Sequence, residues 1–239
     1  TCKSPHEMLG AIIKSYYAEK QGIYPKNIVT VSVMPCVAKK FEAGRYELSV
    51  NGLQDVDLVI TTRELARMIK EAGINFPELP DEEFDPIFGD STGAAAIFGA
   101  TGGVMEAALR TAYEFITGET LEKVDFEDVR GIAGVKEATV KIGDMDVKVA
   151  VASGTGNARK ILDAVKAGEK DYHFIEVMGC PGGCVTGGGQ PIVSAKVRME
   201  KDPRVERAKA IYSVDKDLPL RKSHENPSIK KLYDEYLEK

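Results

Sequence analysis

Three of the four cysteines stand in settings that suit metal ligation. Cys180 and Cys184 belong to a Cys-Pro-Gly-Gly-Cys stretch, and Cys36 follows a Met-Pro pair. Two thiols four residues apart can reach one metal centre, while the glycines between them let the backbone wrap closely and direct N–H groups at the sulfurs. Six glycines fall within the eleven residues 179–189, and ordering such a loop is costly unless it encloses something. The pattern predicts a metal site.

The thiols alone do not identify the metal. Thiolates suit zinc, copper(I) and iron–sulfur clusters alike. A zinc site usually shows two C-x-x-C pairs or Cys and His pairs, whereas this chain has one C-x-x-x-C pair and a distant third cysteine. A further alternative is a zinc-containing or metal-free module in which the thiols only pack in the core, since cysteine is often a small buried residue. Apolar packing, however, does not call for a glycine-rich loop.

The composition of the chain excludes several classes of function. The chain has 239 residues, a net charge of −5 and no basic run, so nothing indicates a nucleic-acid partner. No stretch of about 18 apolar residues predicts a membrane span. Four cysteines are too few for a disulfide scaffold and fit a reducing, cytoplasmic setting. We expect residues 1–239 to form one domain built from two lobes.

The elements before the first candidate ligand form a helix and a strand. Ser4 and Pro5 predict a helix start that Gly22 ends. The β-branched run at 28–33 predicts a buried strand that leads directly into Met34-Pro35-Cys36. Proline lacks an N–H and should end the ladder. Cys36 is therefore expected at the carboxyl end of a strand, where ligands collect in open α/β sheets.

The rest of the chain alternates strands and helices. The predicted strands are 56–61, 135–142, 147–152 and 174–178; the predicted helices follow Thr62 and cover 104–115, 158–167 and 227–237. The 135–152 pair predicts an antiparallel hairpin, and 154–157 a helix-entry turn. This order predicts an α/β fold with two intertwined lobes, each a small, mainly parallel twisted sheet flanked by helices. A predicted strand followed by Met-x-Cys occurs twice, at Met34 and at Met178. Two such strand ends suggest two lobes that face one shared site, so we expect the cluster site in the cleft between the lobes.

Several motifs, in this order, resemble iron-only ([FeFe]) hydrogenases. The segments that carry the resemblance are Lys3-Ser4-Pro5, Met-Pro-Cys-Val-Ala-Lys-Lys-Phe-Glu at 34–42, and residues 57–65, 93–106, 176–191 and 221–226. Together they extend over essentially the whole chain. The resemblance implies the reversible reduction of two protons by two electrons to H₂, at an iron–sulfur centre called the H-cluster.

The resemblance also implies a role for individual residues. In the family, four cysteines hold a [4Fe-4S] cluster, and one thiolate bridges to a two-iron subcluster with CO, cyanide and dithiolate ligands. Cys36 and Cys180 match cubane ligands and Cys184 matches the bridging ligand. Lys39 matches a lysine that hydrogen-bonds a cyanide. The remaining matches are the pocket residues Met34, Met178 and Phe98 and the contacts to the diatomic ligands, Ser4, Pro5 and His6, of which His6 stands where the family often has Gln.

One family signature is not found in these residues. The Cys-Cys-Pro motif, which supplies the fourth cubane ligand and a proton-passing cysteine, is absent, and Cys2 lies outside such a context. The resemblance therefore implies, as partners, an N-terminal segment or subunit with that motif and a ferredoxin-like electron carrier. Without that segment, we expect a purified fragment to be metal-free, and the resemblance does not imply hydrogen turnover by this chain alone. The alternative is a non-catalytic iron–sulfur relative of the cluster-assembly or sensory type.

Overall fold

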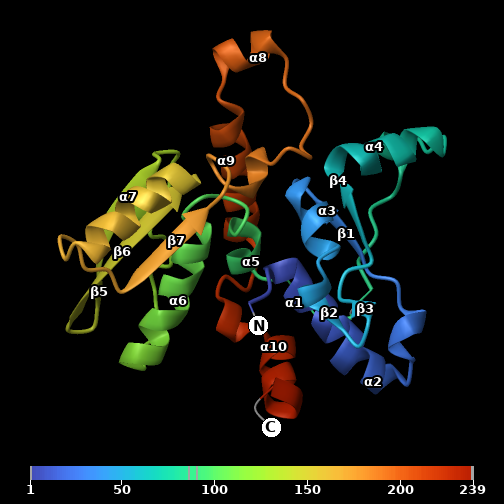
Figure 1. Cartoon of the computed structure of the whole chain (residues 1–239), viewed down its shortest axis with the longest axis horizontal. Coiled ribbons are helices and arrows are strands. Elements are labelled where there is room, and N and C mark those ends of the chain that lie inside the picture. The colour runs from blue at the N-terminus through green and yellow to red at the C-terminus, as the bar shows by residue number, and fades with distance from the viewer. Residues whose placement is uncertain (1, 86, 90, 238–239) are drawn as a thin grey trace. The chain divides into compact units, whose positions relative to one another are not determined.

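The chain divides into two compact units, each built from two separate stretches of sequence. The computed structural model describes residues 2–85, 87–89 and 91–237. The first unit contains Thr1–Ile87 and Gly187–Ile192, and the second contains Phe88–Thr186 and Val193–Lys239. Helices and strands alternate in both (Figure 1). The predicted α/β class and the intertwining of the two parts are confirmed, because the stretch at 187–192 returns to the first unit.

The first unit opens with a continuous helical stretch of three segments, α1 (Pro5–Ile12), a π-helical turn (Ile13–Tyr17) and α2 (Ala18–Gln21). Pro5 occupies the first turn as predicted, but the Ser4 side chain makes no capping hydrogen bond. Gly22, at φ 63°, ends the stretch in the left-handed conformation, which glycine adopts without steric cost.

A two-stranded parallel sheet forms the centre of the first unit. β1 (Val31–Met34) pairs with β4 (Leu58–Thr61), in a register that places Met34 opposite Thr61. Both strands begin two to three residues later than predicted. One face of this sheet packs on a small core of Ala43, Val56 and Val59, with Met34 against it.

Two helices follow the two strands. α3 (Ala38–Ala43) follows β1, and α4 (Thr62–Glu71) follows β4. Thr61 and Glu64 form a reciprocal capping box at the start of α4, which satisfies two of the N–H groups that a helix start leaves unpaired. This local signal explains why the start of α4 was predicted correctly.

A short hairpin, β2 (Ser49–Val50) and β3 (Leu53–Gln54), was not predicted. It turns at Asn51 and Gly52, with φ values of 52° and 77°, and Asn-Gly is the strongest short hairpin signal. The remaining turns of this unit are the 3₁₀ segments Pro25–Asn27, Tyr46–Leu48 and Phe76–Glu78.

The second unit contains a three-stranded sheet of order β5-β6-β7. β5 (Val135–Ile142) and β6 (Met145–Ser153) form the predicted antiparallel hairpin, and β7 (Phe174–Met178) runs parallel to β6. α7 (Thr155–Lys166) makes the crossover between the parallel strands. This sheet is mixed, where mainly parallel sheets were predicted, because a tight turn at Gly143 forces antiparallel pairing.

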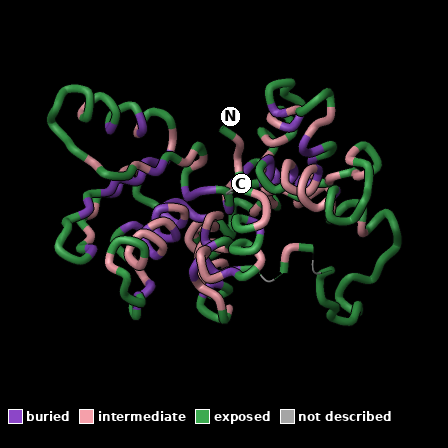
Figure 2. The backbone as a smooth tube through the Cα atoms, turned by 90° about the horizontal axis from the view of Figure 1, so that it is seen from below, coloured by how far each residue is buried: buried purple, intermediate pink, exposed green. Residues whose placement is uncertain are grey.

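Helices cover both faces of this sheet (Figure 1). Alternate residues of β6 divide between two cores. Val149 and Val151 pack with Met105 and Leu109 of α6 (Gly103–Thr117), whereas Ala150 and Ala152 pack with Ala158 and Ile161 of α7. Figure 2 shows such short buried stretches alternating with long exposed ones along the chain.

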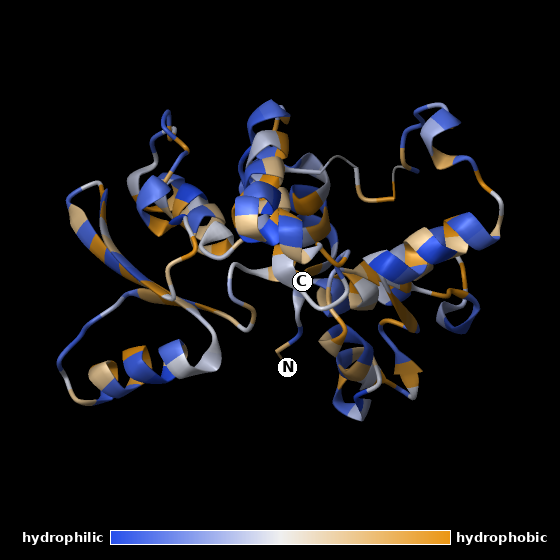
Figure 3. Ribbon diagram, turned by 90° about the horizontal axis from the view of Figure 1, so that it is seen from above, coloured by the Kyte–Doolittle hydropathy of each residue, from blue (hydrophilic) through white to orange (hydrophobic). Residues whose placement is uncertain are grey.

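The second unit contains further helices, of which α5 packs on α6. They are α5 (Gly93–Ile97), α8 (Ala195–Glu200), α9 (Pro203–Asp217), α10 (Pro227–Leu232) with a π-helical end (Tyr233–Leu237), and the 3₁₀ segments Glu127–Val129, Cys184–Thr186 and Ser223–Glu225. The helical tail at 227–237 was predicted; α5, α8 and α9 were not. Many helices carry both hydrophilic and hydrophobic positions (Figure 3). Among the described residues, no helix has the length and apolar character that a membrane crossing requires.

Candidate metal-cluster site

Cys36 lies just beyond the carboxyl end of β1 in the first unit, as predicted. Met34 is the last residue of the strand. The carbonyl of Pro35 accepts a hydrogen bond from the Gly189 N–H (2.9 Å), and the Gly189 carbonyl accepts one from the Arg63 N–H (3.2 Å). The glycine run that follows Cys184 in sequence therefore packs on the strand end that carries Cys36. Cys36 itself is half-buried.

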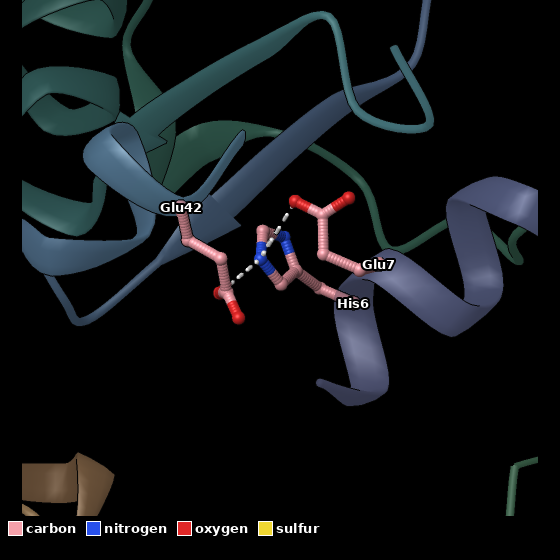
Figure 4. Close-up of side chains that lie close together, drawn as sticks. All are labelled: His6, Glu7 and Glu42. Atoms are coloured by element: carbon pink, nitrogen blue, oxygen red, sulfur yellow. Dashed lines mark hydrogen bonds and ion pairs between the residues drawn. The ribbon is translucent and has the colours of Figure 1, made fainter. Parts of the chain in front are cut away.

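Lys39 and His6 share one carboxylate partner, Glu42. Figure 4 shows the contact between His6 and Glu42. Glu42 stands one turn after Lys39 on α3, and its Oε2 atom pairs with the Lys39 ammonium. The same oxygen lies 3.0 Å from Nε2 of His6, which α1 supplies, while Nδ1 of His6 lies 3.1 Å from the Ser32 hydroxyl. Burial disfavours ionisation of Glu42, but the hydrogen bonds from Lys39 and His6 outweigh it and lower the Glu42 pKa.

Glu7 completes this cluster from the next position of α1. Glu7 is fully buried, and neither of its carboxylate oxygens has a hydrogen-bond partner within the described part of the chain. Oε1 lies 3.4 Å from Nε2 of His6. Burial raises the pKa of Glu7. Sequence reasoning missed both Glu7 and Glu42, although the i, i+3 spacing of Lys39 and Glu42 was a local signal for their ion pair.

The second unit presents Cys180 in the same way that the first presents Cys36. Met178 is the last residue of β7, opposite Ser153. The Ser153 hydroxyl donates to the Cys180 carbonyl (3.0 Å), and the Gly183 N–H donates to the same oxygen (3.0 Å). The Cys180 side chain is not needed for either bond, so the backbone holds the loop while the half-buried thiol stays available.

The loop between Cys180 and Cys184 requires its glycines. Gly182 and Gly183 have φ values of 89° and 97°, a region that other residues enter only with strain. A Cβ atom on Gly183 would also collide with the backbone of Gly99 and Thr101. The collision arises because the loop lies directly on that backbone.

Two hydrogen bonds bind the loop to this backbone. The Thr101 N–H donates to the Gly182 carbonyl (3.1 Å), and the Val185 N–H donates to the Gly99 carbonyl (2.9 Å). Cys184 begins the 3₁₀ turn that follows and is exposed, and the four cysteines, all of which are described, form no disulfide with one another. The interpretation of the three thiols as core packing is therefore disfavoured, because none of them is buried.

Phe98 lies at the end of α5, beside the backbone that carries the loop. It is half-buried and packs against the small core of Ala94, Ile97 and Ala107. Among the predicted site residues, Ser4, Pro5, His6, Met34, Cys36 and Lys39 are in the first unit, and Phe98, Met178, Cys180 and Cys184 are in the second. Within each unit, the predicted residues come from a strand end and the helices next to it.

Two buried side chains of opposite charge support the backbone under the cysteine loop. Glu176 of β7 accepts hydrogen bonds from the N–H groups of Gly102 and Met105, both 2.7 Å long. Lys136 of β5 donates to the carbonyls of Thr101 and Gly131, both 3.0 Å away. Burial raises the pKa of Glu176 and lowers the pKa of Lys136 to about 8.

The depressed Lys136 pKa predicts a pH dependence of stability. Between pH 8 and 10.5 the unfolded chain binds this proton and the folded chain does not, so the free energy of unfolding should rise with pH. The gain is on the order of 3 kcal/mol, at about 1.4 kcal/mol per pKa unit. Urea unfolding between pH 7.5 and 10.5 measures it. The rise should disappear in Lys136→Met and persist in the control Lys160→Met, since Lys160 is exposed. Equal dependence of the free energy of unfolding on pH in the parent and both variants would contradict the prediction.

Comparisons with known proteins agree with this geometry. Residues 1–188 match the model of the family described as iron only hydrogenase large subunit, C-terminal domain, and residues 201–239 match that of the iron hydrogenase small subunit. The chain is 59% identical over 239 residues to the NADP-reducing hydrogenase subunit HndD of Solidesulfovibrio fructosivorans, covering all of this chain and 40% of that protein. It is 30% identical over 243 residues to cytosolic iron-sulfur assembly component 3 of Pongo abelii, covering half of it.

Solved structures give the same result. A variant of [FeFe]-hydrogenase HydA1 from Chlamydomonas reinhardtii superposes with a TM-score of 0.78 at 44% identity, over 99% of this chain and 65% of that one. The chain thus spans less than half the length of the HndD protein and about two thirds of the algal protein. The family match over most of the sequence settles the classification: this chain belongs to the family of C-terminal domains of iron-only hydrogenase large subunits.

Proposed function

We propose that this chain forms the larger part of a hydrogenase domain that binds the H-cluster and catalyses the reversible conversion of two protons and two electrons to H₂. On this proposal it is an oxidoreductase acting on hydrogen, and residues 1–239 act as one domain. Its further partners are a segment or subunit with the Cys-Cys-Pro motif and a ferredoxin-like electron carrier. The family match and the 59% identity to a hydrogenase subunit support it.

The observation that carries the proposal is the pair of strand ends. β1 and β7 each end at a methionine, and each delivers a cysteine two residues later. Neither thiol is fully buried, and the loop after Cys180 keeps a shape that depends on its glycines. Partly accessible soft ligands on a preformed loop suit an iron–sulfur cluster better than they suit apolar packing. The donor set therefore fits the cluster that the family implies.

Three thiolates would hold that cluster. We assign Cys36 and Cys180 as cubane ligands and Cys184 as the ligand that would bridge to the two-iron subcluster. When bound, the cluster supplies the redox chemistry of hydrogen, and the protein supplies ligation, orientation and exclusion of water. Backbone N–H groups of the loop other than that of Gly183, which donates to the Cys180 carbonyl, would tune the potential by hydrogen bonds to the sulfurs.

Four other residues would shape the pocket. We assign Met34, Met178 and Phe98 to its apolar wall, since thioethers and an aromatic ring are polarizable and exclude water. Lys39 would hydrogen-bond a cyanide ligand. Its ammonium is paired with Glu42, but an ammonium has three N–H donors, so the Glu42 contact can orient Lys39 while another donor faces an anionic ligand.

The start of α1 would face the diatomic ligands. We assign this role to Ser4, Pro5 and His6. His6 already contacts Glu42 and Ser32 through its two ring nitrogens, so its orientation is set from both sides. Where the family often has Gln, an imidazole keeps a hydrogen-bonding edge.

A cluster-assembly relative is the competing function. It is supported by the 30% identity to the assembly component. Two observations favour the hydrogenase hypothesis. The identity to the HndD hydrogenase protein is 59%, and the chain contains Lys39, Met34 and Met178, which we assign to the two-iron pocket.

The test is anaerobic reconstitution of the chain, alone and co-expressed with a segment that carries the Cys-Cys-Pro motif. In the two-part protein, which supplies the fourth ligand, we expect about four irons per cluster with a reduced cubane EPR signal and, after two-iron loading, H₂ evolution from reduced viologen. Iron binding without H₂ turnover in either direction would support the assembly-type function. Zinc alone, or no metal in either preparation, would contradict both.

A further inference from the structure

One peptide group, which joins Thr101 to Gly102 at the start of α6, lies between the two buried charges beneath the cysteine loop. Its carbonyl, that of Thr101, accepts a hydrogen bond from the Lys136 ammonium (3.0 Å). Its N–H, that of Gly102, donates to the Glu176 carboxylate (2.7 Å). Lys136 and Glu176 are only 9% and 5% exposed. Each end of the peptide dipole therefore faces a buried charge of the opposite sign.

The conformation of this peptide needs such a restraint. Gly102 has a φ of 93°, and a Cβ atom there would collide with the Val129 carbonyl, so only glycine fits. Glycine is also the residue that most readily leaves any one conformation, because it has the largest backbone freedom. Two charge-assisted hydrogen bonds limit that freedom. The direction of the peptide is thus set by Lys136 and Glu176, which come from β5 and β7, and not by its own sequence.

The same backbone holds the cysteine loop. The Thr101 N–H donates to the Gly182 carbonyl (3.1 Å), so Thr101 binds the loop through its nitrogen and Lys136 through its oxygen. β7 closes this arrangement, because it contains Glu176 and continues into Cys180. A rotation of the restrained peptide would turn the Thr101 N–H away from the loop. The loop would then lose its contact midway between the two cysteines.

We propose that Lys136 and Glu176 are positioning residues for the cluster ligands Cys180 and Cys184. They act through the Thr101–Gly102 peptide and hold the loop in the shape in which both thiolates bind iron. A glycine-rich loop is costly to order, and a loop that is ordered beforehand does not add this cost to metal binding. The role rests on the proposed function for the identity of the cluster, but the restraint on the loop exists without metal.

Hydrogen exchange of the metal-free chain, followed by NMR, tests the restraint. Glu176→Gln keeps the size of the side chain but replaces one acceptor oxygen with a donor, and Lys136→Met removes the donor to Thr101. Each should speed exchange of the Thr101 and Val185 amides by about tenfold more than exchange in the central strand β6, since hydrogen bonds to charged groups contribute more than neutral ones. The matched control is Arg110→Met, which removes a buried charge elsewhere in the unit and should speed both sets of amides alike.

The midpoint potential of the cubane in the two-part protein tests the consequence. Both variants should lose iron to a chelator about tenfold faster than the parent, in line with the affinity that metal sites lose when a group behind a ligand is removed. Both should raise the potential in an EPR-monitored titration, because a loosened loop admits water, which stabilises the more negative, reduced cluster. Arg110→Met should leave the potential unchanged. Action through charge alone predicts instead that Lys136→Met lowers the potential, because it removes a positive charge.

Two results would overturn the positioning role. One is exchange of the Thr101 and Val185 amides that rises no more than exchange in β6. The other is a midpoint potential that stays unchanged in both variants or falls in Lys136→Met. Far-UV circular dichroism checks folding, and either variant alone suffices for each measurement. If the amides respond as expected but no preparation, the parent included, forms a cubane, the proposed function is contradicted and the restraint on the loop stands.

Discussion

Replacing Cys180 with serine is expected to abolish cubane binding, lowering iron in the reconstituted two-part protein from about four per cluster to near zero. A serine hydroxyl stays protonated at neutral pH and is a poor ligand for iron that thiolates hold. The loop should survive the change, because its hydrogen bonds use the Cys180 carbonyl and not its sulfur. Iron and sulfide analysis with EPR of the reduced sample measures the effect.

The control for this experiment is Cys2→Ser. Cys2 is an exposed cysteine outside the three motif positions, so its loss should leave the iron content unchanged. Thermal unfolding of the metal-free proteins should not distinguish Cys180→Ser from the parent. If Cys180→Ser retained full iron while Cys2→Ser lost it, the ligand assignment would be wrong and Cys2 would take the place of a motif cysteine.

Replacing Arg110 with methionine is expected to destabilise the second unit by about 3–5 kcal/mol, the usual cost of leaving buried charges without their partner. Arg110 of α6 is fully buried. Its guanidinium donates to Asp215 of α9 (2.7 and 2.9 Å) and to Glu106 (2.8 Å), and its Nε donates to the Val124 carbonyl (2.8 Å). Hydrogen bonds from Arg110 and Arg221 outweigh burial and lower the Asp215 pKa.

Urea unfolding followed by far-UV circular dichroism measures this loss. A loss of that size is a large fraction of the free energy of unfolding of a typical domain, which is roughly 5–15 kcal/mol. Arg159→Met is the matched control: Arg159 pairs with Asp163 on the exposed side of α7 at 3.8 Å, with side chains 77% and 62% exposed, and surface pairs contribute roughly 0–1 kcal/mol. Arg130 also pairs with Glu106 (2.6 Å), and Arg221 with Asp215 (2.5 Å). A change below about 1 kcal/mol for Arg110→Met would show that these two arginines can neutralise the carboxylates by themselves.

Local patterns predicted the elements that carry the cysteines. The β-branched run before Met34, the hairpin around Gly143 and the strand before Met178 are all observed. α9 was missed although Asp202 caps it and Pro203 occupies its first turn, because its apolar positions do not form one clear stripe. The Asn51-Gly52 hairpin was also missed, although its turn chemistry was present in the sequence.

Long-range pairs could not be predicted. Arg110 and Asp215 are 105 residues apart, His6 and Glu42 are 36 apart, and Gly102 and Glu176 are 74 apart. In each case a charged or polar side chain is buried beside a partner from another element. Sequence spacing reports only neighbours within a helix turn or along a strand, so such partners become known when the elements are packed.

The sequence by itself determined the family resemblance, the α/β class and the placement of Cys36 and Cys180 after strands, because motif order and strand ends depend on residues close together in the chain. Only the tertiary structure decided that Glu42 joins Lys39 to His6 and that the cysteine loop lies on the Gly99–Thr101 backbone. These features depend on which distant elements pack together, and burial, which sets their energies, is a property of the packed chain.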